Sequence, residues 1–141
     1  MNIIAEYPAS HLTLSSTLKS NPATSDVAGL RFDYAAIKDT ILGTEYECSL
    51  AFIGTKRSRT INRTFRGKDK PTDVLSFSYT NTSGEIFICP EIARTKATEF
   101  DRDLTRFLAF LFIHGCFHLK GMRHGGRMEA SEARIRRRFQ I

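Results

Sequence analysis

The feature that most constrains this chain is an apolar stretch from Leu104 to Leu119 that runs into a glycine-containing turn. The stretch is apolar on nearly every side of a helix, and a helix of that kind is buried. His114 and His118 lie four residues apart within it, and therefore on one helix face, one above the other. We expect the rest of the chain to fold around this central helix.

A third histidine follows closely. Gly121 offers a helix end, because glycine adopts left-handed backbone angles at little cost, and the chain can then turn back and bring in His124. Three imidazoles around one point leave the fourth position of a tetrahedral zinc open, as in catalytic sites. The spacing predicts a metal ion held by His114, His118 and His124. Cys116 points about 200° around the helix from His114 and is not an expected ligand.

Metzincin proteases have histidines at the same spacing, which gives an alternative interpretation. Those enzymes carry a glutamate directly after the first histidine as the general base. This chain has Gly115 there, so it lacks the carboxylate that activates water for peptide hydrolysis. The protease interpretation therefore loses its chemical basis.

The net charge of +6 is concentrated in one part of the 141 residues. Within residues 56–70, seven basic residues stand against one acid, Asp69. Such a patch attracts and positions phosphates, although a solvated helix face would carry the same charges. Beside a metal site, the patch favours a polyanionic substrate. The basic residues expected to contact it are Arg57, Arg59, Arg63, Arg66, Lys68 and Lys70.

Hydrophobic periodicity predicts an α+β fold in a single domain. Residues 11–24 are assigned no structure, with His11 at the surface, and Asp101 is expected to cap the central helix. Strands are expected at residues 2–6, 45–53, 74–79 and 85–89, and further helices at residues 32–42, 56–65, 90–98 and 127–139.

The sequence also bears on location. The N-terminus lacks the pattern of a signal peptide, and the longest apolar run is too short to cross a bilayer. Three cysteines, Cys48, Cys89 and Cys116, form no CxxC pair and suit reduced thiols. We expect a cytoplasmic protein with no membrane association and no organic cofactor.

Three segments of the chain resemble the YbeY family of bacterial zinc-dependent endoribonucleases, the rRNA maturation factors. They are residues 62–77 (NRTFRGKDKPTDVLSF), residues 84–89 (GEIFIC) and the histidine motif of residues 114–124. The resemblance implies a small mixed sheet of about four strands flanked by helices. It also implies one zinc ion per chain, with His114, His118 and His124 as its ligands, and a functionally important arginine, Arg66.

The same resemblance implies cleavage of single-stranded RNA, in 16S rRNA 3′-end maturation and ribosome quality control. The expected partners are single-stranded RNA, 16S rRNA and the small ribosomal subunit. In this hypothesis Arg66 and the metal ligand His114 are the catalytic groups, and Asp73 or Glu85 orients a histidine or serves as base. Asp73 could equally cap a turn or a helix. The alternatives are a ribosome-associated RNA-binding module with a structural zinc, and a metal-dependent hydrolase of another substrate.

The chain departs from the family pattern next to its third histidine. Arg123 stands where an acidic residue is usual. An acid there could orient a ligand histidine, whereas a cation either weakens metal binding or adds a phosphate contact. The motif also has Phe117 in place of leucine and Met122 in place of an aromatic residue.

Overall fold

The computed structural model describes residues 11–14 and 32–141, with the side chains of residues 11–14 left out of the description. The strand predicted at residues 2–6 lies outside the described residues. So do the side chain of His11 and most of the stretch from residue 11 to residue 24.

A mixed four-stranded sheet forms one layer of the fold, as the resemblance implied. Its strands are β1 (His11–Leu14), β2 (Glu47–Phe52), β3 (Val74–Thr80) and β4 (Ser83–Ile88). The order across the sheet is β1-β2-β4-β3, in which β2 and β4 are parallel and both edge strands are antiparallel to their neighbours. The assignment of no structure to residues 11–14 was therefore wrong, because these residues pair with β2.

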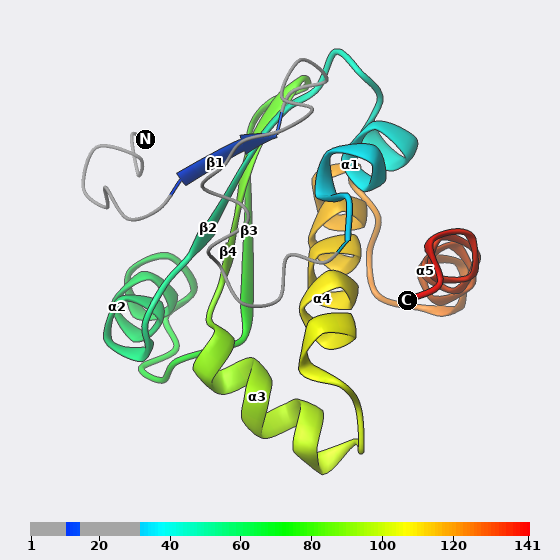
Figure 1. The fold of residues 1–141 in the computed structure, drawn as a ribbon. Helices are drawn as coiled ribbons and strands as arrows, with labels where there is room; N and C mark the ends of the chain where they lie inside the picture. Colours follow the sequence, from blue (N-terminus) through cyan, green and yellow to red (C-terminus); the bar gives the residue numbers. More distant parts are fainter. Residues whose placement is uncertain (1–10, 15–31) are drawn as a thin grey trace.

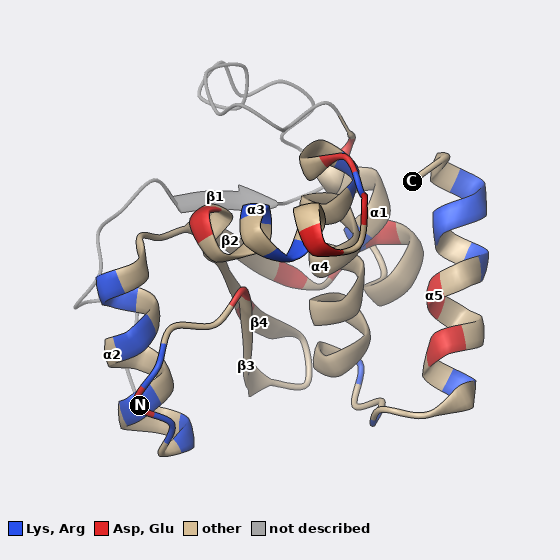
Figure 2. Ribbon diagram, turned by 90° about the horizontal axis from the view of Figure 1, so that it is seen from below, with Lys and Arg blue, Asp and Glu red and all other residues tan. Residues whose placement is uncertain are grey.

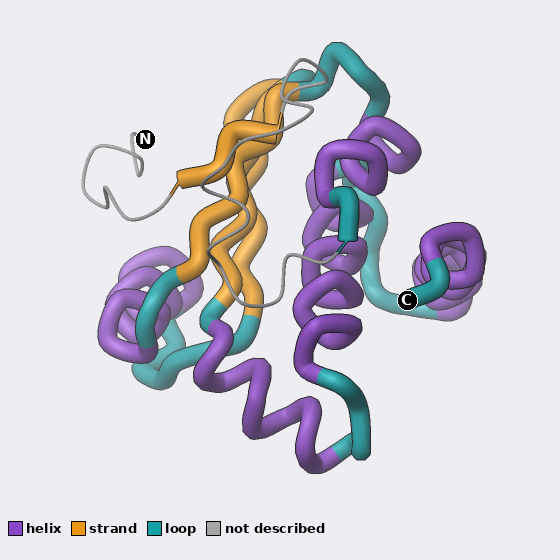
Figure 3. The backbone as a smooth tube through the Cα atoms, viewed as in Figure 1, coloured by secondary structure: helices purple, strands orange, loops and turns teal. Residues whose placement is uncertain are grey.

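Five helices in the described part of the chain surround the sheet. They are α1 (Tyr34–Leu42), α2 (Thr55–Arg66), α3 (Pro90–Glu99), α4 (Leu104–Leu119) and α5 (Gly126–Phe139), close to the predicted ranges. Figures 1 and 3 show α2 on one side of the sheet and α4 on the other, with α5 on the far side of α4. Among the described helices, none combines the length and apolar content needed to cross a bilayer.

The predicted burial of α4 is confirmed. Phe112 and Ile113 are fully buried, and apolar side chains on most sides of the helix lie in the main core cluster. Each large apolar side chain that is buried contributes about 1.5–3 kcal/mol. Packing against β3, β4 and the neighbouring helices therefore fixes the position of α4 in the fold.

The cap of α4 differs from the prediction. Asp103 caps the helix, its carboxylate accepting a hydrogen bond from the backbone N–H of Arg106 at 3.3 Å. Asp101 instead adopts a φ of +52° in the turn after α3. Both aspartates are suitable caps by residue type, and the choice depends on where the turn between the two helices ends.

Candidate metal centre and cleft

The C-terminal end of α4 turns sharply and returns the chain to the face that carries the first two histidines. Gly121 has a φ of +95°, and its N–H donates to the carbonyl oxygen of His118 at 2.9 Å. The N–H of Met122 donates to the carbonyl oxygen of Phe117 at 3.0 Å. The predicted glycine turn is therefore present, and it brings His124 back beside the helix.

The three histidines meet at one point, as predicted. Their rings lie 4.5 to 5.0 Å apart between centroids, and one possible ligand atom from each lies within 4.8 Å of the other two. The Nε2 atoms of His114 and His118 are 3.1 Å apart. Two nitrogens bound to one tetrahedral zinc at about 2.0–2.1 Å would be about 3.4 Å apart. The trio is thus close to the geometry that a single ion requires.

Hydrogen bonds at the other ring nitrogens orient two of these histidines. The Nδ1 of His114 lies 3.1 Å from Oε2 of Glu132, and the Nδ1 of His118 lies 3.1 Å from the carbonyl oxygen of Met122. A carbonyl and an ionised carboxylate only accept hydrogen bonds, so each Nδ1 carries the proton. The Nε2 atoms are left with free lone pairs that face each other, the form in which imidazole binds metals.

Burial and the neighbouring positive groups favour the neutral form of His118. Burial lowers the pKa of His118, as do the neighbouring His114 and His124 and the positive charge of Arg66, against a hydrogen bond to Met122 that raises it. A metal ligand must be deprotonated, so this shift favours ion binding near neutral pH.

Gly115 faces the sheet and leaves no room for a side chain. A Cβ atom there would lie 2.9 Å from Oγ of Ser76 and 3.0 Å from Cδ1 of Ile86. The position that holds the metzincin glutamate is therefore packed against β3 and β4 in this fold. Cys116 is fully buried and lies outside the histidine cluster, as expected, and burial raises the pKa of its thiol well above its usual value.

Sequence reasoning missed Glu132 and suggested Asp73 or Glu85 as the group that orients a histidine. Asp73 accepts hydrogen bonds from the backbone N–H of Val74 and from Lys96, both at 2.9 Å, which agrees with its alternative role in a turn. Glu85 accepts a 2.6 Å hydrogen bond from the hydroxyl of Tyr79. It pairs with Phe77 across the sheet and so points to the face covered by α2, away from α4.

One signal in the sequence could have pointed to Glu132. The buried face of α5 contains Met128, Ser131, Glu132 and Ile135. A carboxylate at helical spacing within an apolar stripe needs a partner, since burying an unpaired charge is costly. The neighbouring Glu129 is exposed. Helical spacing therefore distinguishes the two glutamates, because only Glu132 falls on the buried face of α5.

A cleft of about 550 Å³ opens beside the histidines. Arg66, the last residue of α2, reaches it from a distant part of the sequence, and its Nη2 lies 3.5 Å from the carbonyl oxygen of Ser76. The structure thus brings together the trio and the predicted arginine. The lining residues are Arg66, Ser76, Ser78, His118, Leu119, Met122, Arg123 and His124.

The other predicted RNA-contacting residues lie outside this cleft. Figure 2 shows basic residues along α2. Arg59 donates two hydrogen bonds to Asp69, at 2.9 and 3.1 Å, and Arg63 lies 3.6 Å from the same carboxylate. Lys68 and Lys70 are exposed in the following loop, and Arg57 is half-buried on α2. Their contact with RNA stays a prediction.

The fold and the site define an α+β protein with an open three-histidine centre beside an arginine-lined cleft. A model of the family described as endoribonuclease YbeY matches residues 23–140. The chain therefore belongs to the YbeY family.

Individual relatives agree with this assignment. The chain is 38% identical over 103 residues to an endoribonuclease YbeY of Alkaliphilus metalliredigens, covering 65% of this chain and 66% of that protein. It is 36% identical over 95 residues to one of Colwellia psychrerythraea, covering 62% and 61%. A solution structure of a Thermotoga maritima protein is similar, with a TM-score of 0.57 and 26% identity over 72% of this chain and 75% of that one. The chain thus aligns with slightly less than two thirds of these two curated relatives.

Proposed function

We propose that this protein is a metal-dependent endoribonuclease that cleaves single-stranded RNA. The observation that carries the proposal is the convergence of three imidazoles on one point, at the wall of a cleft that two arginines, Arg66 and Arg123, also line. Membership of a family described as endoribonucleases supports the reaction class. Phosphodiesters are anionic, and an arginine-lined cleft attracts them.

The donor set suits one zinc ion per chain, held by His114, His118 and His124. Three neutral nitrogens at converging positions leave a tetrahedral ion one open coordination position, and two of the imidazoles are already oriented by Glu132 and Met122. When bound, zinc supplies a Lewis acid that lowers the pKa of water to about 7 and stabilises negative charge on phosphate.

Arg66 is the proposed catalytic arginine. Its guanidinium is permanently charged and presents donors in a fork that matches phosphate oxygens. From the end of α2 it would bind a non-bridging oxygen of the scissile phosphate and stabilise charge there as the bond to the leaving oxygen breaks. Arg57, Arg59, Arg63, Lys68 and Lys70 would follow the rest of the backbone.

The biological substrate that we propose is 16S rRNA at its 3′ end, within the small ribosomal subunit, with a further role in ribosome quality control. A cytoplasmic location follows from that substrate. These assignments rest on the family resemblance, and the basic α2 is the feature of this chain that supports a large RNA substrate.

Two other functions share the same site. In a ribosome-associated RNA-binding module the zinc would mainly support folding, but α4 is fixed by apolar packing, which favours the enzyme. Against a hydrolase of another substrate, the two arginines favour an anionic substrate over an uncharged one, and a peptidase would need a base that Gly115 cannot supply.

The test compares zinc-loaded and chelated protein on single-stranded and duplex RNA of the same sequence. We expect cleavage of the single strand by the zinc-loaded protein alone. The matched variant is His118→Ala, which should stay folded by circular dichroism and lose cleavage. Full activity of either the chelated protein or this variant would refute the proposal.

A further inference from the structure

The cleft carries a second arginine, Arg123, to which the proposed function assigns no individual role. We propose that Arg123 binds the phosphate next to the scissile one, so that Arg66 and Arg123 hold the RNA strand from two sides of the metal centre. This inference rests on the proposed function and adds a residue that positions the substrate.

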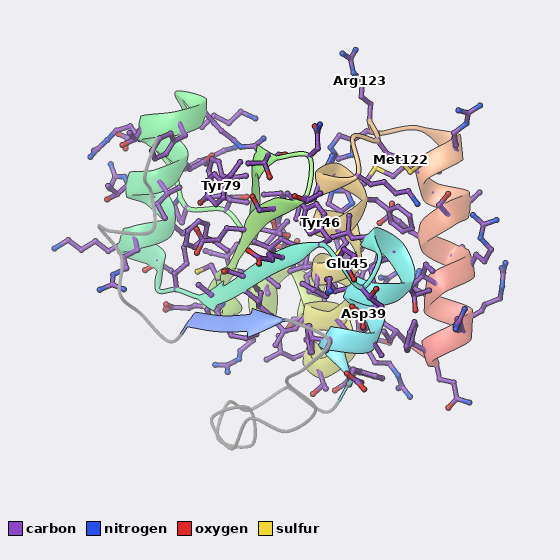
Figure 4. All side chains as sticks on the ribbon, turned by 90° about the horizontal axis from the view of Figure 1, so that it is seen from above. Asp39, Glu45, Tyr46, Tyr79, Met122 and Arg123 are labelled. Atoms are coloured by element: carbon purple, nitrogen blue, oxygen red, sulfur yellow. The ribbon has the colours of Figure 1, made fainter. Side chains whose placement is uncertain are left out.

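The two arginines come from different parts of the fold. Arg66 ends α2 and shares its side of the cleft with Ser76 and Ser78 of β3. Arg123 lies in the loop between α4 and α5, directly before His124, and Figure 4 shows its side chain extending outward from that loop. The helix α4, which packs on β3 and leads into the loop, contributes His118 to the same cleft. A strand bound in this cleft beside the histidines can therefore meet both guanidiniums.

The described residues that line this cleft include two arginines and no carboxylate. Within residues 32–141, neither Arg66 nor Arg123 has a carboxylate oxygen within ion-pairing distance, whereas Arg59 and Arg63 share Asp69. Two unneutralised guanidiniums offer charge-assisted, bidentate hydrogen bonds to phosphate oxygens. Arg123 is exposed, so its side chain can adjust to a bound strand.

The positions of the two arginines distinguish their roles. The Nη2 of Arg66 lies 3.5 Å from the carbonyl oxygen of Ser76, and the Oγ of Ser76 lies 3.4 Å from the carbonyl oxygen of Gly115, the residue after His114. Arg66 is therefore placed beside the helix that carries the first two histidines, at the scissile phosphate. Arg123, at the rim, is placed for the adjacent phosphate of the same strand.

The test measures binding of zinc-loaded protein to a short single-stranded 2′-O-methyl RNA across about 50–200 mM KCl. Removing one phosphate contact reduces the slope of log binding constant against log salt by about 0.7 for a single strand. We expect that change for Arg123→Ala, with binding weakened roughly twofold to fivefold, as for an exposed ion pair. Arg123→Lys should retain the slope. Arg94→Ala, an exposed change on α3, should leave the slope unchanged.

Cleavage of single-stranded RNA gives a second readout that a purely structural role would not produce. Arg123→Ala should raise KM with kcat nearly unchanged, and the zinc content should stay at one equivalent. An unaltered salt slope and KM in Arg123→Ala, with wild-type protein cleaving RNA, would overturn the role of Arg123 and leave the proposed function standing. A loss of zinc in this variant would also overturn it. Absence of zinc-dependent cleavage by the wild type would instead contradict the proposed function.

Discussion

Glu132 orients the first histidine of the trio although it lies on a different helix. Its side chain is largely buried, and its Oε2 lies 3.1 Å from Nδ1 of His114. A carboxylate at this position fixes the tautomer of the imidazole and raises the basicity of Nε2. The properties of a candidate metal ligand on α4 are thus set in part by a residue of α5.

Glu132→Gln should weaken zinc binding without unfolding the protein. The amide has nearly the same shape, but it removes the negative charge that stabilises the His114 ring in its ligand form. The expected loss in zinc affinity is about 10- to 100-fold, measured by competition with a chromophoric chelator. The control is Glu129→Gln, at an exposed position of the same helix. Equal zinc affinities for the two variants would contradict the role of Glu132.

Arg66→Ala should reduce RNA cleavage while the zinc content stays at one equivalent. Loss of one donor to the developing charge typically lowers kcat by about 10²- to 10³-fold. The matched variant is Arg63→Ala, on the same helix but paired with Asp69 outside the cleft, which should have a much smaller effect on kcat. Single-turnover cleavage rates measure the difference between the two variants. Similar rates for Arg66→Ala and Arg63→Ala would remove Arg66 from the catalytic step.

At the scale of the secondary-structure elements, local patterns predicted most of the fold. The apolar run of α4, the basic helix α2 and the alternating strand β3 all have the period of the structure they form. β1 was missed because its four residues are too few to show an alternation of polar and apolar side chains. The strand forms because it pairs with β2, which is distant in sequence. Asp103 was missed because Asp101 has the same capping chemistry, and only the turn between α3 and α4 decides between them.

The close approach of α4 to the sheet gives a prediction for Gly115. Gly115→Glu, which restores the metzincin pattern, should destabilise the protein by about 3 kcal/mol or more, because the side chain would be forced against Ser76 and Ile86 and its charge would be buried. Chemical denaturation measures the effect. The control, Gly126→Glu, adds an acid in open space at the start of α5 and should be neutral or slightly stabilising. A stable Gly115→Glu protein would contradict the packing described for α4.

At the scale of the whole molecule, the candidate metal centre lies at the edge of a core built from apolar side chains. The core cluster on this side of the sheet joins α1, α4, α5 and the strands β2 and β4. The three histidines are half-buried or exposed and lie outside that cluster. We therefore expect an ion bound at this place to serve chemistry more than folding.

Removal of the metal should therefore leave the protein folded. We expect the chelated protein to keep its far-UV circular dichroism and to unfold cooperatively, with a Tm several degrees lower. Ligand at 100 times its Kd contributes about 2.7 kcal/mol to stability, a fraction of what the core supplies. Loss of cooperative unfolding on chelation would favour the structural-zinc module over the enzyme.

The sequence predicted the convergence of the three histidines better than their surroundings, for a physical reason. His114, His118 and His124 are close in sequence, so helix geometry and one glycine turn determine how they meet. Glu132 reaches the site through packing of α5 on α4, and Arg66 through the position of α2 beside β3. Such contacts depend on the assembled fold. The basic patch contained Arg66 among six candidates, and only the family resemblance singled it out.

The central claim is that three imidazole nitrogens of this chain bind one zinc ion and leave one position open. X-ray absorption at the zinc edge, on protein titrated with one equivalent of zinc, tests this claim most directly. The account predicts three nitrogen ligands at about 2.0–2.1 Å and one further oxygen ligand. A sulfur ligand at about 2.3 Å, or a first shell without three nitrogens, would contradict it.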